Sequence, residues 1–228
     1  MFSTQSITVL LADDHAIVRQ GLCALLKMHG QFTVVGEART GREAVNMAQA
    51  LQPNVIVMDI SMPELNGLEA TRQILAANPA ARVLILSAHN DDAYFLRMHE
   101  AGAAGFLEKL ASADLVAKAI RTVAAGKPFF SAAMAKRLKE AQNLSRDRDG
   151  LAKANASRLT HREAEVLQLV AEGSANKQVA DLLAISIKTV EKHRQHVMNK
   201  LNIHNTAGLT RYAIAAGIIE GKARLAVA

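Results

Sequence analysis

The sequence predicts a doubly wound α/β domain with a five-stranded parallel sheet, followed by a separate all-α domain. Two observations support this prediction. Short β-branched runs alternate with segments of helical period five times in the first half, whereas the second half contains no convincing strand. The charge also changes: residues 1–130 hold 11 Lys and Arg against 12 Asp and Glu, and residues 131–228 hold 16 against 9. The positive excess of the second half suggests a polyanionic partner.

The composition is typical of a globular protein with a proper core. Hydrophobic residues make up 50% of the chain and charged residues 21%, which excludes wholesale disorder. No apolar run approaches the roughly 20 residues that cross a bilayer, and the N-terminus lacks the pattern of a secretory signal. The single cysteine, Cys23, is expected to be a buried thiol, compatible with a reducing compartment. We therefore expect a cytoplasmic protein.

Five strand-like runs order the first half. The runs are Ile7–Ala12, Phe32–Ala38, Asn54–Asp59, Arg82–Ser87 and Ala104–Glu108. Segments of helical period cover residues 15–28, 41–52, 65–77, 91–101 and 112–125. Several strands are almost continuously apolar, which is typical of parallel strands covered on both faces. The alternation predicts a (βα)5 sheet of the flavodoxin-like type.

Capping patterns mark two helix starts. Thr40 with Glu43, and Thr160 with Glu163, each have the spacing of a capping box. We expect the helix that Thr160 opens to stop at Gly173, since glycine favours the left-handed conformation that ends helices.

The domain boundaries follow from these patterns. We expect a first domain over residues 1–126, a helical linker over 127–157 and a second domain over 158–228. Within the linker, residues 132–142 suit one more helix, and residues 143–157 show no apolar period.

Polar side chains stand where the strands of the predicted sheet end. They are Asp13, Asp14, Asp59, Ser87 and Lys109. Ligands of doubly wound sheets gather at the carboxyl ends of the strands. Converging carboxylates repel one another unless a cation lies among them, and hard oxygen ligands suit Mg²⁺. A carboxylate, a divalent cation, a lysine and a hydroxyl together suit phosphoryl transfer to an aspartate.

The motifs around these residues resemble those of response-regulator receiver domains, over residues 6–126. The matching strings are Leu11-Ala12-Asp13-Asp14-His15, Asp59-Ile60-Ser61-Met62-Pro63-Glu64-Leu65-Asn66-Gly67, Ser87-Ala88 and Gly105-Phe106-Leu107-Glu108-Lys109. The resemblance implies that Asp59 accepts the phosphoryl group. It implies that Asp14, Asp59 and the main-chain carbonyl of Ser61 ligate Mg²⁺, with Asp13 acting through a metal-bound water.

The same resemblance assigns the remaining residues of the site. Lys109 is implied to contact the phosphoryl oxygens. Ser87 and Phe106 match the positions through which receivers relay phosphorylation to another face. Phe106 has no hydroxyl, so packing rather than a new hydrogen bond would drive its rotation, and an ordinary core aromatic is the alternative. His15 and His89 are interpreted as rim residues without a ligand role.

A helix-turn-helix pattern occupies the second domain. It consists of a helix over Asn176–Leu183, a turn at Ala184–Ile185 and a helix over Ile187–Leu201 with Ser186 as N-cap. Apolar residues cluster on one side of the second helix: Ile187, Val190, Val197, Met198 and Leu201. Polar residues cluster on the other: Lys188, Glu191, Lys192, Gln195 and Asn199. Any amphipathic surface helix shows this periodicity.

The polar side nevertheless has the chemistry of base recognition. Lys188, Glu191, Lys192 and Gln195 carry donors and acceptors that match base edges in a major groove. Candidates for phosphate contacts, which position without specifying, are Lys177, Thr189, His193, Arg194 and Lys200.

Longer strings resemble the LuxR-type domain of NarL/FixJ regulators, over residues 158–221. They are Leu159-Thr160-His161-Arg162-Glu163-Ala164-Glu165-Val166-Leu167, Gly173 to Lys177, Thr189-Val190-Glu191-Lys192-His193-Arg194 and Lys200-Leu201. The likeness implies four helices, the last from near Asn205 to near Gly217, which pairs two domains on DNA. Leu209, Ala213 and Ile214 are candidates for that dimerisation face, and core packing explains them almost as well.

Together the two resemblances predict a DNA-binding response regulator of a two-component system. Its expected partners are a sensor histidine kinase, promoter DNA, a second copy of the chain and, as a further candidate, RNA polymerase. No enzyme activity is expected beyond transient phosphoryl acceptance and, at most, slow autodephosphorylation. One alternative is a Mg²⁺-dependent phosphatase, although Asp59-Ile60-Ser61 lacks a second catalytic Asp two residues on. Another is a constitutive DNA-binding protein with an inert receiver.

Overall fold

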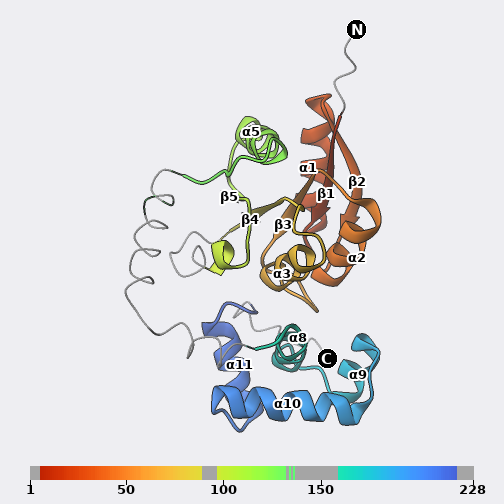
Figure 1. The fold of residues 1–228 in the computed structure, drawn as a ribbon, viewed down its shortest axis with the longest axis vertical. Helices are drawn as coiled ribbons and strands as arrows, with labels where there is room; N and C mark the ends of the chain where they lie inside the picture. Colours follow the sequence, from red (N-terminus) through yellow and green to blue (C-terminus); the bar gives the residue numbers. More distant parts are fainter. Residues whose placement is uncertain (1–5, 89–96, 132–133, 135, 137–158, 220–228) are drawn as a thin grey trace. The chain divides into compact units, whose positions relative to one another are not determined.

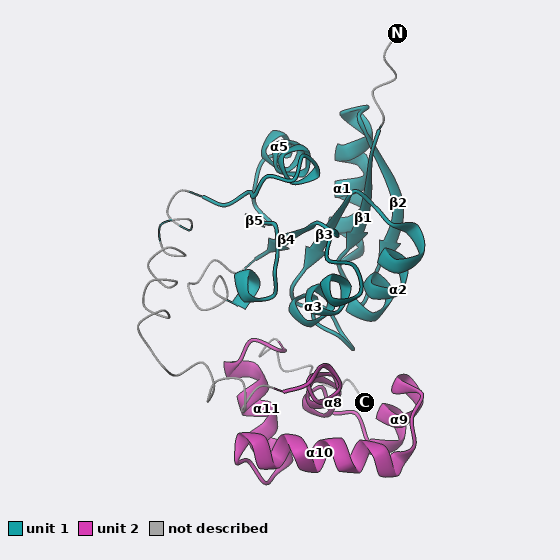
Figure 2. Ribbon diagram, in the orientation of Figure 1, with its two compact units in different colours: residues 1–152 teal, residues 153–228 magenta. Residues whose placement is uncertain are grey.

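The fold was obtained as a computed structural model that describes residues 6–88, 97–131, 134, 136 and 159–219 (Figure 1). The chain divides into two compact units, residues 1–152 and 153–228 (Figure 2). The predicted linker helix and the stretch after it, like His89 and the start of the helix predicted over 91–101, lie outside the described residues, apart from isolated positions.

A five-stranded parallel sheet forms the centre of the N-terminal unit. Its strands are β1 (Ile7–Ala12), β2 (Phe32–Ala38), β3 (Val55–Asp59), β4 (Val83–Ser87) and β5 (Gly105–Glu108), in the order β2-β1-β3-β4-β5. The chain therefore runs outward in both directions from β1. A crevice forms beyond the carboxyl ends of the strands at such a switch point. The predicted doubly wound fold is confirmed.

Two layers of helices cover the sheet because its strands are apolar on both faces. The helices are α1 (Ala16–Met28), α2 (Gly41–Leu51), α3 (Gly67–Ala77) and α5 (Ala113–Ala124). Alternate residues of one strand enter different cores: Leu10 packs in a cluster with Ala44 of α2 and Ile74 of α3. Its neighbour Val9 packs in a second cluster with Leu26 and with residues of α5. This period of two is the geometry of a strand buried on both sides.

Of the two hydrogen bonds in the capping box predicted at Thr40, one forms and the other does not. The Thr40 hydroxyl accepts a hydrogen bond from the Glu43 amide, as expected of an N-cap. The Glu43 carboxylate, however, accepts from the amide of Arg39 at 2.7 Å rather than from that of Thr40. The amide one residue earlier lies closer to this side chain, so the helix start is capped without a reciprocal pair.

The chain leaving α5 returns to the edge of the sheet. Phe129 forms an isolated parallel bridge with Gly105 of β5. Its carbonyl accepts from the Phe106 amide at 2.9 Å, and its amide donates to the Ala104 carbonyl at 3.0 Å. Residues past the expected domain end at 126 thus occupy part of the β5 edge.

The described part of the C-terminal unit, residues 159–219, contains four helices: α8 (His161–Ala171), α9 (Asn176–Leu183), α10 (Ile187–Leu201) and α11 (Thr206–Ala215). Thr160 and Glu163 form the reciprocal capping box, and Gly173 has a φ of +95° after α8. Ser186 caps α10 by accepting from the Thr189 amide. Their shared core includes Leu167, Val179, Val190, Val197 and Leu209.

None of the helices among the described residues is long and apolar enough to span a bilayer.

Candidate acidic site and nucleic-acid interface

The predicted acidic residues meet at one edge of the sheet. Asp13 and Asp14 follow β1, and Asp59 ends the neighbouring β3, where Ala12 pairs with Met58 in the parallel register. Asp13, Asp14, His15 and Asp59 each present a ligand atom, and these atoms all lie within 4.8 Å of one another. His15, interpreted from the sequence as a rim residue, contributes one of these atoms although its side chain is 54% exposed, and its Nδ1 lies 2.8 Å from Asp14 Oδ1.

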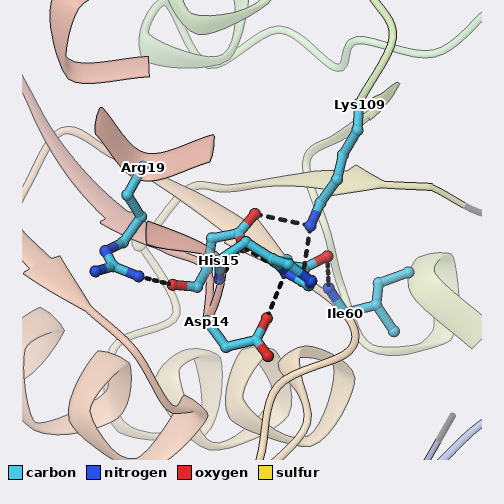
Figure 3. Close-up of polar contacts among 7 residues, drawn as sticks. Asp14, His15, Arg19, Ile60 and Lys109 are labelled. Carbon is cyan, nitrogen blue, oxygen red and sulfur yellow. Dashed lines mark hydrogen bonds and ion pairs between the residues drawn. The ribbon is translucent and has the colours of Figure 1, made fainter. Parts of the chain in front are cut away.

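Lys109 joins the two buried carboxylates of this cluster (Figure 3). Its Nζ lies 2.7 Å from Asp13 Oδ2 and 2.9 Å from Asp59 Oδ2. Both aspartate side chains are 3% exposed. The residue reaches the site because it follows β5 directly, and its amide donates to the Ser87 carbonyl at 2.8 Å.

The buried charges perturb one another. Burial raises the pKa of Asp59, and the negative charge of Asp13 adds to this, while Lys109 acts in the opposite direction. Burial alone would lower the pKa of Lys109, but Asp59 and Asp13 outweigh it, so that pKa is raised. Three carboxylates and one ammonium leave a formal charge of −2 at the site, which the addition of a divalent cation would neutralise. The oxygen donors therefore fit Mg²⁺.

The loop after β3 holds the main chain of Asp59 closely. The Asp59 Oδ1 atom accepts from the Ile60 amide at 2.8 Å, and the Gly67 amide donates to the Ile60 carbonyl at 2.8 Å. A Cβ atom on Gly67 would lie 1.8 Å from the Asp59 carbonyl oxygen, so no larger residue fits there. Ser61, the predicted main-chain ligand, lies in this same loop and is half-buried.

Ser87 and Phe106 lie on the two strands beyond β3. Ser87 ends β4 and is buried, one residue after Leu86, which pairs with Asp59. Phe106, on β5, pairs with Ile85 and packs in the core cluster that also contains Met58. Phe106 is thus buried, as both the relay role and the core alternative require.

One buried residue beside the site was missed by sequence reasoning. Arg19, on α1, donates from Nη1 to the main-chain carbonyl of Asp13 at 2.7 Å. It shares the buried face of α1 with Leu22 and Leu26, three and seven residues further on. A cation at these apolar spacings is the signal that would have found it.

The predicted base-reading face of α10 is exposed to solvent. Lys188, Glu191, Lys192, Gln195 and Asn199 are exposed, whereas Val190 and Val197 are buried on the other side. Ile187 was placed with the apolar side, but as the first residue of α10 it is 46% exposed.

Two of the predicted phosphate contacts are engaged within the unit. Arg194 donates to Asn176 Oδ1 at 3.1 Å and to Thr206 Oγ1 at 2.5 Å, so it links α10 to the starts of α9 and α11. Lys200 Nζ lies 2.7 Å from the buried Glu163 Oε2. Of the other candidates, Lys177 is exposed, and Thr189 and His193 are half-buried.

The predicted dimerisation face needs correction. Leu209 and Ala213 are buried in the structure, and Leu209 belongs to the core of the C-terminal unit. Both lie on α11, which packs against α8, and their burial leaves neither available to a second copy. Ile214, which is 42% exposed, is available.

Comparison with known proteins gives matches for both units. A family model described as the response regulator receiver domain matches residues 9–121, and one described as bacterial regulatory proteins of the luxR family matches residues 157–213. The transcriptional regulatory protein LiaR of Bacillus subtilis is 38% identical, with 91% of this chain and 96% of LiaR covered. DegU of Brevibacillus brevis is 34% identical, with 94% and 95% covered.

A solved structure of RcsB from Salmonella enterica serovar Typhimurium, bound to promoter rprA with the phosphomimetic BeF3⁻, is also similar. It is 26% identical with a TM-score of 0.55, and the match covers 91% of this chain and 98% of that one.

Proposed function

Because the chain belongs to the response-regulator family, with a receiver and a LuxR-type DNA-binding domain, we propose that phosphorylation of Asp59 controls its binding to DNA. The chain is a DNA-binding transcriptional regulator of the NarL/FixJ class. The phosphoryl group comes from a sensor histidine kinase. Because its target is genomic DNA, the protein acts in the cytoplasm.

The placement of Lys109 carries this proposal. An ammonium within 3 Å of two buried carboxylates is costly to bury, and an apolar cluster of similar volume would stabilise the fold as well, so folding alone does not explain this arrangement. The same ammonium suits the oxygens of an incoming phosphoryl group. The pKa of Asp59 is raised by burial and by the charge of Asp13, and this supports a site that a cation would join.

The transfer forms one bond and breaks one. An Asp59 carboxylate oxygen attacks phosphorus, the bond from phosphorus to the donor histidine nitrogen breaks, and the electron pair stays on that nitrogen. Lys109 and the Ser87 hydroxyl donate to the oxygens of the bound phosphoryl group. Asp14, Asp59 and the main-chain carbonyl of Ser61 would hold Mg²⁺, with Asp13 acting through a metal-bound water, and the ion would supply the positive charge that the phosphoryl oxygens need.

Acetyl phosphate labelling tests this assignment. The wild-type chain with Mg²⁺ should gain one phosphoryl group in intact mass, and Asp59→Asn should gain none. Asp114→Asn is the matched control, because its side chain is 95% exposed on α5 of the same unit. Equal labelling of wild type and Asp59→Asn would remove Asp59 as acceptor. We also propose that the phosphorylated chain loses this group slowly without a partner. The half-life of the labelled form measures the rate of this autodephosphorylation.

On the output side, we assign base reading to the exposed face of α10 and pairing of two copies to α11 through Ile214. Lys192→Ala should relax base preference, with a loss of about 1–3 kcal/mol on the preferred site. Lys177→Ala, on α9, should weaken binding to all sequences alike and reduce the salt dependence. A uniform loss for Lys192→Ala would move Lys192 to the phosphate contacts.

A further inference from the structure

We propose that Arg19 is a positioning residue for the phosphorylation site, which fixes the peptide that joins Asp13 to Asp14 and so sets the affinity for the divalent cation. This inference rests on the proposed function. It concerns a residue of α1 that takes no part in the phosphoryl transfer itself.

The burial of Arg19 is the first observation. The residue is 6% exposed, in the second turn of α1, where its neighbours on the same face are leucines. Burying a guanidinium costs free energy unless its donors are satisfied. A long apolar residue would pack at this position without that cost, so helix packing alone does not explain an arginine.

The contacts of the guanidinium are the second observation. Its Nη1 atom donates to the Asp13 carbonyl at 2.7 Å, the length of a charge-assisted hydrogen bond. Its Nε atom lies 3.4 Å from the Glu37 carboxylate, near the end of β2. In Figure 3, Arg19 and Lys109 approach the acidic residues from opposite sides. One side chain therefore links α1, the end of β1 and the end of β2.

The peptide that Arg19 holds leads to the expected metal ligand. The Asp13 carbonyl lies in the same plane as the Asp14 amide, because the peptide bond is planar. Fixing this carbonyl fixes the plane from which Asp14 departs. The Asp13 amide is held as well, by the Ala38 carbonyl at 3.1 Å, and the Asp13 Oδ1 atom accepts from the His15 amide at 2.8 Å.

Asp13 is consequently held on every side by a different group. Its amide is held by β2, its carboxylate by Lys109 and the His15 amide, and its carbonyl by Arg19. Among these, the Arg19 contact alone restrains the peptide plane on the Asp14 side. Loss of that contact frees the acidic pair to turn, and a metal site whose ligands must be ordered on binding has lower affinity.

Titration of the full chain with Mg²⁺ by isothermal calorimetry tests the proposal. Arg19→Met retains the apolar stem and removes the donors. Its dissociation constant for Mg²⁺ should rise about 10- to 100-fold, as is typical when a residue that orients metal ligands is lost. Arg72→Met is the matched control, because Arg72 is a half-buried arginine of α3 that pairs with Glu69, and it should leave Mg²⁺ affinity unchanged.

A kinetic measurement separates positioning from a merely structural role. Labelling by acetyl phosphate should need more Mg²⁺ for half-maximal rate in Arg19→Met, while the rate at saturating Mg²⁺ stays close to wild type. A misfolded site would lose the saturating rate too. Arg19→Lys keeps the charge but has one head group for two partners, so its dissociation constant should rise less than that of Arg19→Met.

The outcomes are distinct. A folded Arg19→Met with wild-type Mg²⁺ affinity overturns the proposal, and if that variant does not fold, wild-type affinity in Arg19→Lys and in Arg19→Gln does so. Failure of the wild-type chain to bind Mg²⁺, or labelling of Asp59→Asn, would instead overturn the proposed function.

Discussion

Asp59 and Glu163 are both buried carboxylates that face a lysine, yet their environments shift their pKa values in opposite directions. Burial raises the pKa of Asp59, and Lys109 compensates only in part because it is shared with Asp13. Burial alone would raise the pKa of Glu163 as well, but Lys200 and the Thr160 amide and hydroxyl outweigh it and lower that pKa. Lys200 lies 2.7 Å away, and the Thr160 amide donates at 2.8 Å.

The difference distinguishes a site from a structural pair. The Glu163 carboxylate is satisfied by groups of its own unit, the Thr160 amide and Lys200. It thereby links the start of α8 to the end of α10. The acidic site of the N-terminal unit has one ammonium for three carboxylates, so its charge is left unbalanced, and the proposed Mg²⁺ would balance it. A buried acid near a lysine is therefore diagnostic of a ligand site only when its partners are too few.

Of the changes considered, addition of Mg²⁺ should produce the largest difference in stability between the two units. At 100 times its dissociation constant, it should stabilise the N-terminal unit by about 2.7 kcal/mol and leave the C-terminal unit unchanged. Differential scanning calorimetry of the full chain measures both transitions. Asp14→Asn, which removes an expected ligand, should reduce the shift. A shift of the C-terminal transition by Mg²⁺ would contradict the comparison.

Removing the structural carboxylate should have the next largest effect. Glu163→Gln should destabilise the C-terminal unit by about 2 kcal/mol, less than for a fully buried pair because Lys200 can regain water. Its melting temperature should fall by several degrees in calorimetry. Glu191→Gln, on the exposed face of α10, is the control and should stay within about 0.5 kcal/mol of wild type. Equal effects of both variants would show that Glu163 has no special role.

The same kind of substitution in the acidic site should change the free energy of unfolding in the opposite direction. Asp59→Asn should stabilise the metal-free N-terminal unit by about 1 kcal/mol, because it removes a buried charge that is under-compensated. Urea denaturation in EDTA gives the free energy of unfolding. Destabilisation by Asp59→Asn would mean that Lys109 satisfies Asp59 fully. At saturating Mg²⁺, the wild-type chain should be more stable than Asp59→Asn.

The smallest effect expected is in the pH dependence of stability. Asp59 and Glu163 should change the stability of their units over different ranges of pH. The pKa of Asp59 is raised, so its unfavourable contribution appears as pH rises from the ordinary aspartate range through the raised value. The pKa of Glu163 is lowered, so its favourable contribution is full above the ordinary glutamate range and is lost as pH falls through the lowered value. Stability difference curves of the two variants against pH should therefore change on opposite sides of the ordinary carboxyl range. Coincident windows would contradict this.

Most of the fold could be predicted because it follows local periodicity. The bounds of β1, β2, α9 and α10 agree with the predicted ranges, since apolar alternation or helical period ends at a cap or a polar residue there. The meeting of Asp59 with Lys109 could also be predicted, because parallel strands bring their carboxyl ends to one edge. The roles of these residues in metal and phosphoryl binding stay predictions.

What sequence patterns did not reveal depends on contacts between distant elements. Periodicity gives Lys200 an exposed position, but it does not show that Glu163, 37 residues earlier, lies within its reach. Leu209 and Ala213 fit an interface and a core equally well until α8 is placed against them. The apolar spacing of Arg19 could have indicated its burial, but its partner is the main-chain carbonyl of Asp13, and a main-chain group leaves no trace in the residue types.

The bridge between Phe129 and β5 sets a limit on how the N-terminal unit can be shortened. A chain ended at residue 126 would expose the backbone groups of Ala104 and Phe106 at the sheet edge, and uncovered edges invite pairing with other molecules. A soluble, monomeric fragment should accordingly extend beyond Phe130, whose side chain packs against the core. The first residues after α5 thus belong to the sheet as much as to the predicted linker.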